Sequence, residues 1–208
     1  MDTDPIDESE DNDSEYARLV NVNCRQGALS NLWYRLIGRD SATRSWQRQA
    51  DPDLVFDLDK LTLCGVDVGS SVNRLQDTGL GPADESYGDG VRALHYPDLG
   101  LDITAYDSSG ICILELHWYD REWKHSPDRS FPGRCLFDGR ELSLSSATKA
   151  ADVQEMLGPP TTQEEGDEGF SSLEYRVSKG EITFSFDDEE GGGLSFALCH
   201  AGFMLKDF

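Results

Sequence analysis

The amino-acid sequence predicts an α+β protein in which two tandem helix-plus-antiparallel-meander repeats form one layered helix-on-sheet domain. The first observation is an internal echo, because most of segment 55–118 is spelled a second time, in the same order, within 136–200. The second is that each copy has a short amphipathic stretch, a Gly-Pro stop and then alternating apolar residues. A period of roughly 80 residues exceeds the 20 to 50 residues of a solenoid unit, so it indicates a duplicated half-domain.

The echo is carried by four pairs of segments whose separation changes only where loops are expected. The pairs are Phe56-Asp57 with Phe137-Asp138 (137 − 56 = 81), Leu80-Gly81-Pro82 with Leu157-Gly158-Pro159 (157 − 80 = 77), Leu94-x-Tyr96 with Leu173-x-Tyr175 (173 − 94 = 79) and 100–107 with 180–187 (180 − 100 = 80). We therefore expect a first repeat over 51–118, a linker over 119–133 and a second repeat over 134–208.

Each copy is expected to open with a strand and a helix. Asp138-Gly139 is typical of a tight turn leading into a strand with one buried face. Ser145, Ser146 and Thr148 offer N-cap oxygens to a helix over 147–157, which Gly158-Pro159 ends because proline cannot continue the hydrogen-bond ladder. In the first copy the corresponding signals are a cap at Gly69-Ser70-Ser71 and a stop at Gly81-Pro82.

Three short strands are expected after a polar loop, which spans 83–90 in one copy and 161–169 in the other. Ile182, Phe184 and Phe186 alternate with polar residues, which is typical of a strand with one buried face. The last strand of each copy is expected to bury Cys112, Leu114 and Leu116, or Leu194, Phe196 and Leu198. Three strands and one helix cannot bury a core alone, so the two copies are expected to pack together.

These motifs resemble the β-lactamase-inhibitor-protein-like repeat. The shared features are a Gly-Ser-Ser or Ser-Ser-x-Thr cap, a short helix, Leu-Gly-Pro, a variable loop, Leu-x-Tyr and a glycine-punctuated meander, over 55–118 and 136–200. The module also occurs in small lipoproteins of bacterial outer-membrane assembly. The resemblance implies a bacterial helix-on-sheet protein that binds another protein and has no catalytic residues. This chain departs from the secreted relatives because it shows neither a signal peptide nor a lipidated cysteine near its start.

Charge limits the partners that the protein can bind. The 208 residues carry a formal net charge of −22 with a pI near 4.3. A surface of this sign repels phosphate, so it argues against nucleic acid and against anionic membranes and favours a basic protein partner. No run approaches the roughly 18 apolar residues of a membrane span.

The charge is unevenly distributed near the N-terminus. Residues 1–15 hold eight acids and no base, which predicts an acidic disordered leader. Because a secretory leader would open with basic residues and an apolar core, this leader predicts a cytoplasmic protein. Residues 16–50 hold six arginines against the single acid Asp40 and form a basic N-terminal extension. This extension could engage an acidic partner, but we expect it to pack on the protein's own acidic core. Its apolar stretch 28–37 fits a helix or a strand.

Aromatic residues in the first loop and around the linker are the candidate protein-binding residues. Aromatic side chains dominate binding hot spots, which singles out Tyr87, Trp118, Tyr119 and Trp123. A linker also has to pack over the seam between the repeats, so burial is the alternative for these side chains.

The sequence shows no catalytic, cofactor-binding or metal-binding motif. Five cysteines without a Cys-x-x-Cys pair indicate neither a zinc ribbon nor a disulfide framework, and Cys112 and Cys199 are expected to be buried. His117, His125 and Glu122 lack a recognised ligand spacing. The acidic run 187–190 before three glycines could hold calcium, but it lacks the order of a dedicated loop, so a solvated hairpin tip is favoured.

Together these observations favour a non-enzymatic protein-binding module without a cofactor. Its binding surface would be the outer face of the paired sheets or the helix-to-strand loops, and an immunity-type inhibitor of a basic toxin or nuclease is one specific version. The alternative is a small-molecule or hydrolytic site in the cleft between the repeats, using His95 or His117 with a carboxylate. A deep pocket at such a histidine would favour the alternative, whereas a flat sheet would favour the binding module. A scaffold with no specific ligand is the third hypothesis.

Overall fold

The computed structural model describes residues 41–208 except 89, 119–120, 124–125, 166–169, 188–192 and 202–208, and at 121–123, 126–128, 170 and 201 it describes the backbone alone. Residues 41–208 form one compact unit. The predicted acidic leader 1–15, the apolar stretch 28–37 and most of the basic extension 16–50 lie outside the described residues.

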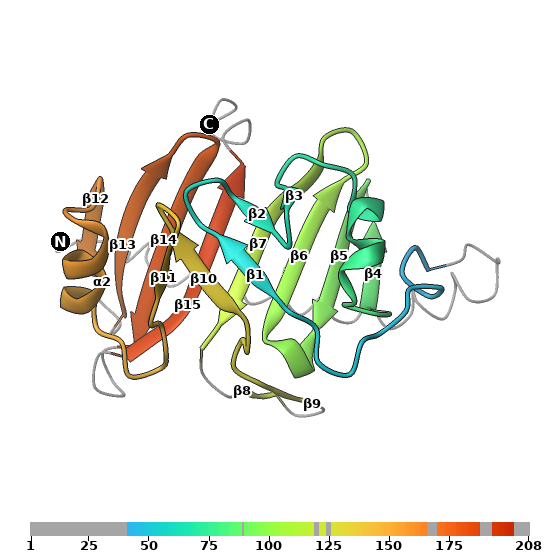
Figure 1. Ribbon diagram of the computed structural model, residues 1–208, viewed down its shortest axis with the longest axis horizontal. Coiled ribbons are helices and arrows are strands. Elements are labelled where there is room, and N and C mark those ends of the chain that lie inside the picture. The colour runs from blue at the N-terminus through green and yellow to red at the C-terminus, as the bar shows by residue number, and fades with distance from the viewer. Residues whose placement is uncertain are drawn as a thin grey trace, which may run out of the picture. The chain divides into compact units, whose positions relative to one another are not determined.

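An eight-stranded antiparallel sheet is the largest element of this unit (Figure 1). Its order is β12-β13-β14-β15-β7-β6-β5-β4, so each half is an up-and-down meander and the halves meet where β15 pairs with β7. The first meander comprises β4 (Asp84–Gly88), β5 (Val91–Tyr96), β6 (Leu101–Tyr106) and β7 (Gly110–His117), and the second comprises β12 (Thr162–Glu165), β13 (Phe170–Val177), β14 (Gly180–Asp187) and β15 (Gly193–Ala201).

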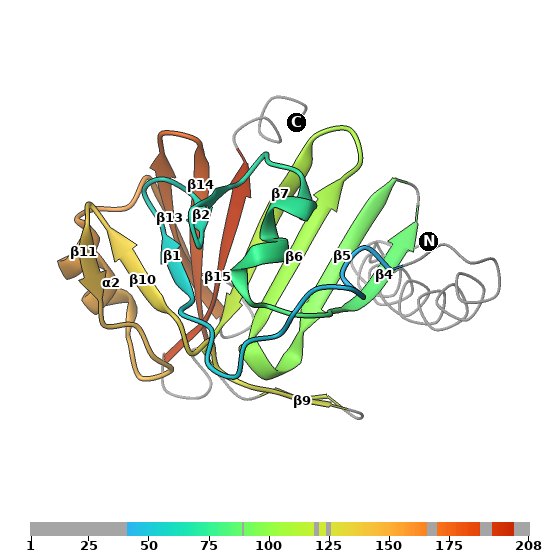
Figure 2. The ribbon, with the colours of Figure 1, turned by 45° about the vertical axis from the view of Figure 1, so that its right-hand side comes forward.

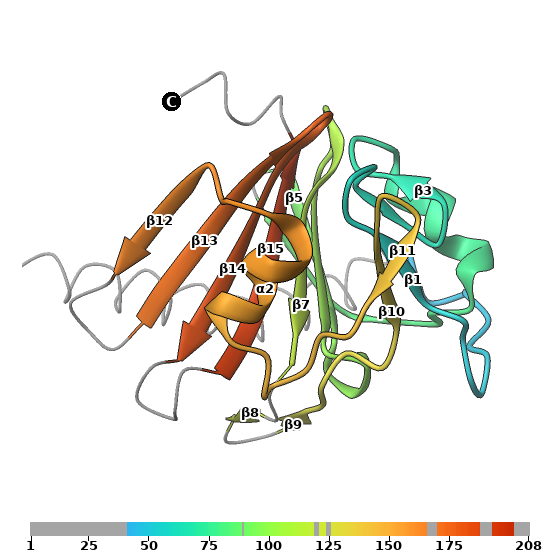
Figure 3. The same cartoon turned by 60° about the vertical axis from the view of Figure 1, so that its left-hand side comes forward.

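A five-stranded sheet covers one face of the large sheet, as Figure 3 shows nearly edge-on. Its strands are β1 (Val55–Asp57), β2 (Thr62–Leu63), β3 (Val66–Asp67), β10 (Arg134–Phe137) and β11 (Arg140–Leu142), in the order β11-β10-β1-β2-β3. At its centre β1 and β10 are parallel, with Phe56 opposite Cys135. The core lies between the two sheets and includes the fully buried Phe56, Phe184 and Ile103. A separate hairpin is formed by β8 (Arg121–Trp123) and β9 (Ser126–Asp128), within the predicted linker.

The predicted α+β helix-on-sheet class is wrong, because the described residues are mostly strand and the layer over the large sheet is itself a sheet. The helices are short: 3-10 helices η1 (Val72–Thr78) and η2 (Pro97–Leu99) and one α-helix, α2 (Ala150–Leu157). Figure 2 shows η1 on the same side of the large sheet as β1 and β2. Segment 72–78 buries only Val72 and Leu75, which are three residues apart and so lie on one face of a 3-10 helix. The segment therefore contributes little apolar surface to the covering layer.

The ends of the two helices agree with the expectation only at Gly158. In the second half α2 begins after Lys149, whose backbone N–H donates to the Asp152 carboxylate at 2.9 Å, whereas Ser145 and Thr148 stabilise the preceding turn. Gly158 ends it as predicted, with φ +86°. In the first half η1 ends at Gly79 in the left-handed conformation, two residues before the predicted stop.

Each predicted polar loop contains a fourth strand, β4 in 83–90 and β12 in 161–169. Both are edge strands that pair on one side only. The sequence pattern missed them because their residues are mostly polar; all four residues of β12 are exposed, so no apolar alternation marks the strand.

The pairing also corrects the predicted alignment of the halves. Tyr96 opposes Leu101 and Tyr175 opposes Ile182, so β6 corresponds to β14 at an offset of 81 (182 − 101) and not 80. A slip of one residue exchanges the two faces of a strand. Equivalent β-bulges follow, at Thr104/Ala105 and at Ser185/Phe186.

The second bulge changes which residues of β15 are buried. Leu194, Ala197 and Cys199 are buried toward the five-stranded sheet, whereas Phe196 and Leu198, which were expected in the core, are only partly buried on the opposite face. The expected burial of Cys112 and Cys199 is confirmed, since both are fully buried.

Candidate functional site

The structure describes the side chains of two of the four predicted protein-binding residues, Tyr87 and Trp118. Trp118 is only 4% exposed and packs edge-on against Phe131, with 6.4 Å between ring centroids, so it belongs to the core. Tyr119 lies outside the described residues, as does the side chain of Trp123 on β8. Tyr87 remains, half-buried on the edge strand β4.

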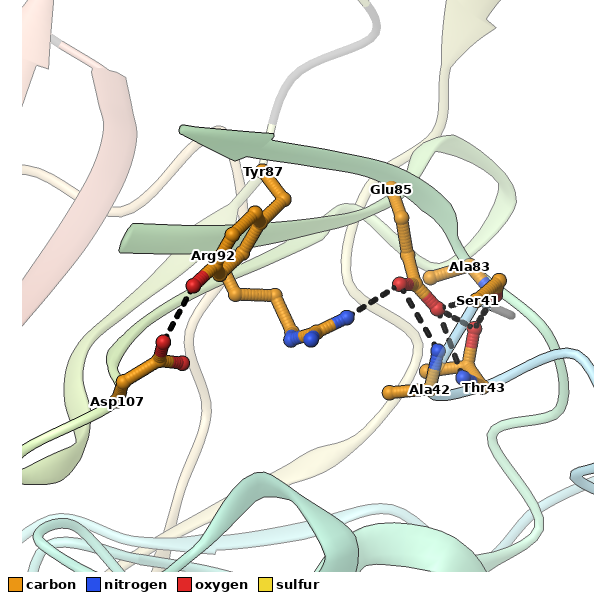
Figure 4. Close-up of polar contacts among 8 residues, drawn as sticks. All are labelled: Ser41, Ala42, Thr43, Ala83, Glu85, Tyr87, Arg92 and Asp107. Atoms are coloured by element: carbon orange, nitrogen blue, oxygen red, sulfur yellow. Dashed lines mark hydrogen bonds and ion pairs between the residues drawn. The ribbon is translucent and has the colours of Figure 1, made fainter. Parts of the chain in front are cut away.

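Tyr87 forms part of a polar cluster at the edge of the first half (Figure 4). Its hydroxyl donates to the Asp107 carboxylate, and the Arg92 guanidinium lies over its ring at 5.1 Å from the centroid. A cation–π contact of this kind contributes about 0.5 to 1 kcal/mol at an exposed site. Tyr87 therefore ties β4 to the turn after β6.

Glu85 is the centre of the same cluster and was missed by the sequence reasoning. Its carboxylate accepts hydrogen bonds from the hydroxyls of Ser41 and Thr43, from the backbone N–H of Thr43 at 2.7 Å and from Arg92 at 2.8 Å. Burial raises the pKa of Glu85, but the hydrogen bonds outweigh burial and the net pKa is lowered. The carboxylate thereby fastens residues 41–43 to β4 (Figure 4).

Two further contacts attach the described end of the basic extension to the core. Trp46 is buried in the core at 4% exposure. Arg48 forms an ion pair with Asp98 of η2. At these positions residues 41–50 pack on the protein's own body, while the rest of the predicted extension 16–50 lies outside the described residues.

A hollow of about 470 Å³ lies beside this cluster, between the start of η1 and the turn after β6. Its lining is largely polar and includes Ser71, Asn73, Arg92, Asp107 and Ser109. The hollow belongs to the first half alone, and neither His95 nor His117 lines it. It is therefore not the histidine-containing cleft between repeats that the alternative hypothesis requires.

The second polar cluster lies on the outer face, by which we mean the face of the eight-stranded sheet turned away from the five-stranded sheet. Three strands each place a residue side by side there, because His95 opposes Asp102 and Asp102 opposes Glu115. Asp102 contacts both histidines: its Oδ1 meets Nδ1 of His95, and its Oδ2 lies 3.1 Å from Nε2 of His117. The Glu115 carboxylate lies 3.6 Å from the same His117 nitrogen.

The electrostatics of this cluster centre on Asp102. Burial raises the pKa of Asp102, but hydrogen bonds and charge from His117 and His95 prevail and lower it to about 2. The side chain of His117 is 3% exposed, whereas those of Asp102 and Glu115 are 33% and 29% exposed. The cluster thus combines a buried imidazole with two ionisable oxygen ligands that solvent reaches.

The structure brings both histidines of the alternative hypothesis to one carboxylate, on the surface of a sheet. The pattern Glu115-x-His117 is the sequence signal that could have paired Glu115 with His117, since residues two apart on a strand share a face. Asp102 could not be found in this way because it comes from a neighbouring strand. The side chains of His125 and Glu122 lie outside the described residues, as does most of the acidic run 187–190.

An apolar strip occupies the middle of the outer face. This seam patch consists of Ile113, Phe196 and Leu198, all partly buried, where β7 and β15 pair. Phe196 lies opposite His117, with ring centroids 6.4 Å apart. On the far side of the seam patch, Glu181 of β14 lies opposite His200 of β15. Burial and the neighbouring carboxylate of Glu174 raise the pKa of Glu181. Acidic groups therefore flank the seam patch on both sides.

Comparison with known proteins adds no relative: a scan against protein-family models and searches of curated proteins and of solved structures found no match. The similarity to the β-lactamase-inhibitor-protein-like repeat therefore depends on the sequence motifs alone. Within the described part of the chain, no helix has the length and apolar content needed to cross a membrane.

Proposed function

We propose that this protein is a non-enzymatic module that binds a basic protein on the outer face of its eight-stranded sheet. The observation that supports the proposal is the seam patch, an apolar strip on a sheet surface flanked by Glu115 on one side and by Glu174 and Glu181 on the other. A protein interface has this composition, with an apolar centre inside a polar rim.

Charge complementarity supports a basic protein as the partner. A chain of net charge −22 attracts a basic surface over long range, which accelerates encounter and selects against acidic partners. The close carboxylates of Glu174 and Glu181 repel one another in the free protein, so a cation from the partner would relieve that repulsion. Lysine or arginine side chains around an apolar anchor fit this surface.

An inhibitor or immunity-type role in the cytoplasm is the specific form of this proposal. The similarity of the sequence motifs to β-lactamase-inhibitor-protein-like repeats supports it, as does the acidic charge. In that role the partner is a basic toxin or nuclease, and the outer face covers its substrate-binding surface.

The proposal is tested with the full chain as bait, using Leu198→Lys and Glu174→Lys. Both substitutions place a cation on the outer face near an acid, beside Glu115 or Glu181, so the fold is expected to persist. We expect a basic protein that wild type captures from lysate to be lost with both variants. Its affinity for the purified variants, measured by calorimetry, should fall at least tenfold.

Matched controls carry the same substitutions away from the outer face. Asp77→Lys on η1 and Glu155→Lys on α2 change exposed acids in the elements that cover the opposite face, and they should leave capture unchanged. Equal recovery by wild type and both outer-face variants, or equal loss in the controls, would contradict the proposal. Circular dichroism of each variant verifies folding.

A further inference from the structure

We propose that Asp102, Glu115 and His117 form a binding site for a divalent first-row transition-metal ion, with Zn²⁺ as the representative ion. The site lies on the outer face of the first half and joins β6 to β7. It goes beyond the proposed protein binding, because metal binding is a property of the isolated chain.

The backbone places the three candidate ligands without distortion. Glu115 and His117 are two residues apart on β7 and so point to the same face, and Asp102 is the cross-strand neighbour of Glu115 on β6. The ligand atoms of all three residues lie within 4.8 Å of one another. Two adjacent strands therefore supply a triangle of ligands that the sheet holds in register.

The distances within this triangle agree with metal coordination. The His117 nitrogen is 3.1 Å from the Asp102 oxygen and 3.6 Å from the Glu115 oxygen. Nitrogen and oxygen ligands lie about 2.0 to 2.2 Å from Zn²⁺, so two ligands at tetrahedral corners are separated by roughly 3.4 Å. A metal ion can therefore sit between the three atoms with only small side-chain rotations.

The donor set selects the type of ion. One imidazole nitrogen with two carboxylate oxygens suits Zn²⁺ and neighbouring transition metals, whereas Mg²⁺ and Ca²⁺ prefer oxygen ligands alone. Two carboxylates with a neutral imidazole carry two negative charges, which a divalent ion neutralises. Asp102 and Glu115 are partly exposed, so an ion can reach their carboxylates from solvent.

His95 completes the arrangement from the next strand. Its Nδ1 contacts the Asp102 oxygen that does not face His117. Metal-binding side chains are commonly oriented by such outer hydrogen bonds, and loss of the outer partner typically costs 10- to 100-fold in affinity. His95 is therefore a positioning residue and not a ligand.

The second half of the molecule provides an internal control. The positions that correspond to Asp102 and Glu115 hold Thr183 (183 − 102 = 81) and Leu198 (198 − 115 = 83), and only His117 has a histidine counterpart, His200 (200 − 117 = 83). The second half thus has the same backbone without two of the three ligands. Zn²⁺ binding should belong to the first half alone.

The experiment is titration of tag-free, chelator-treated full-length protein with Zn²⁺, followed by calorimetry and by metal analysis after gel filtration. We expect one Zn²⁺ per chain, weaker binding of Mn²⁺, and no competition from a hundredfold excess of Mg²⁺ or Ca²⁺. Asp102→Asn and Glu115→Gln preserve side-chain shape and should each lower the Zn²⁺ affinity at least 100-fold. His95→Gln should lower it about 10- to 100-fold.

Three controls separate this site from diffuse binding by an acidic chain with free thiols. His200→Gln, Glu155→Gln and Cys64→Ser should leave affinity and stoichiometry unchanged. Nitrogen-15 NMR of the imidazoles adds a structural readout, since Zn²⁺ should shift Nε2 of His117 and not the nitrogens of His200. Failure to saturate at one ion, full affinity in Asp102→Asn or Glu115→Gln, or equal loss in His200→Gln would overturn the site. Because no partner is added, these outcomes are independent of the capture experiment.

Discussion

At the scale of single residues, the Glu85 carboxylate joins residues 41–43 and Arg92 in one hydrogen-bonded cluster. Its side chain is 10% exposed and is surrounded by donors from residues 41–43 and by Arg92. Hydrogen bonds to a charged group contribute about 1.5 to 3 kcal/mol, more than those between neutral groups. Together with buried Trp46 and the Arg48–Asp98 ion pair, Glu85 thus holds the chain before β1 against the first half.

Glu85→Gln keeps the shape of the side chain and removes the charge, and we expect it to lower the free energy of unfolding by about 2 kcal/mol at pH 7. The folded-state pKa is below the ordinary value of 4.5, so this stabilisation is fully present above pH 4.5 and is lost as the pH falls through the folded-state pKa. The difference between wild type and variant should therefore shrink toward zero in acid. Urea unfolding at pH 7, 5 and 3 measures it.

The exposed Glu155→Gln is the control for this prediction, and it should change the free energy of unfolding by less than about 0.5 kcal/mol at every pH. A Glu85→Gln deficit that persists unchanged at pH 3 would mean that shape, and not charge, is what stabilises the contact.

At the scale of elements, the two sequence motifs that recur most clearly contact each other in each half. The Tyr96 hydroxyl donates to the Gly81 carbonyl at 3.3 Å, and the Tyr175 hydroxyl donates to the Gly158 carbonyl at 3.1 Å. Leu-x-Tyr and Leu-Gly-Pro are thus two ends of one interaction, which ties the end of each helical segment to the second strand of its meander. Burial raises the pKa of both tyrosines, so both hydroxyls remain protonated donors.

Tyr96→Phe and Tyr175→Phe should each cost about 1 kcal/mol of unfolding free energy, because the carbonyl of Gly81 or Gly158 loses its side-chain donor. The effects should be additive in the double variant, since the two sites lie in different halves. Thermal and urea unfolding measure both. Tyr106→Phe on the outer face is the matched control and should change stability by less than about 0.5 kcal/mol. A neutral result at both tyrosines would show that the rings, and not the hydroxyls, explain the recurrence.

At the scale of the whole described unit, the halves are joined twice. In the large sheet β7 and β15 pair over five positions, centred on Glu115 opposite Leu198. In the small sheet β1 of the first half pairs in parallel with β10 of the second. Each half therefore depends on the other for a neighbouring strand in both sheets.

Neither half is expected to fold alone. Residues 41–118 would expose the edge of β7 and lose β10, and residues 134–208 would expose the edge of β15 and lose β1. We expect each isolated fragment to lack cooperative thermal unfolding by circular dichroism, and an equimolar mixture of the two to recover it. A single fragment that unfolds cooperatively as a monomer would show that the halves are independent domains.

The sequence predicted local features well where a short pattern carries them. The Asp138-Gly139 turn forms with both residues at positive φ between β10 and β11, and Gly158 ends α2 as expected. The sequence-based prediction failed at the edge strand β12, whose polar residues show no apolar alternation. It also failed in β15, where one extra residue in the bulge turns Phe196 outward. Cys64-Gly65 forms a second turn with positive φ, which an Asn-Gly or Asp-Gly search does not detect.

Taken alone, the sequence determined that two segments carry the same succession of elements and which residues of β7 and β14 are buried, because the alternation of apolar side chains is a local property of the chain. Tertiary structure alone decided that the covering layer is a sheet and that His95, Asp102, Glu115 and His117 meet. Those outcomes depend on hydrogen bonds between strands that are distant in sequence, and on a register in which one extra residue exchanges the faces of a strand.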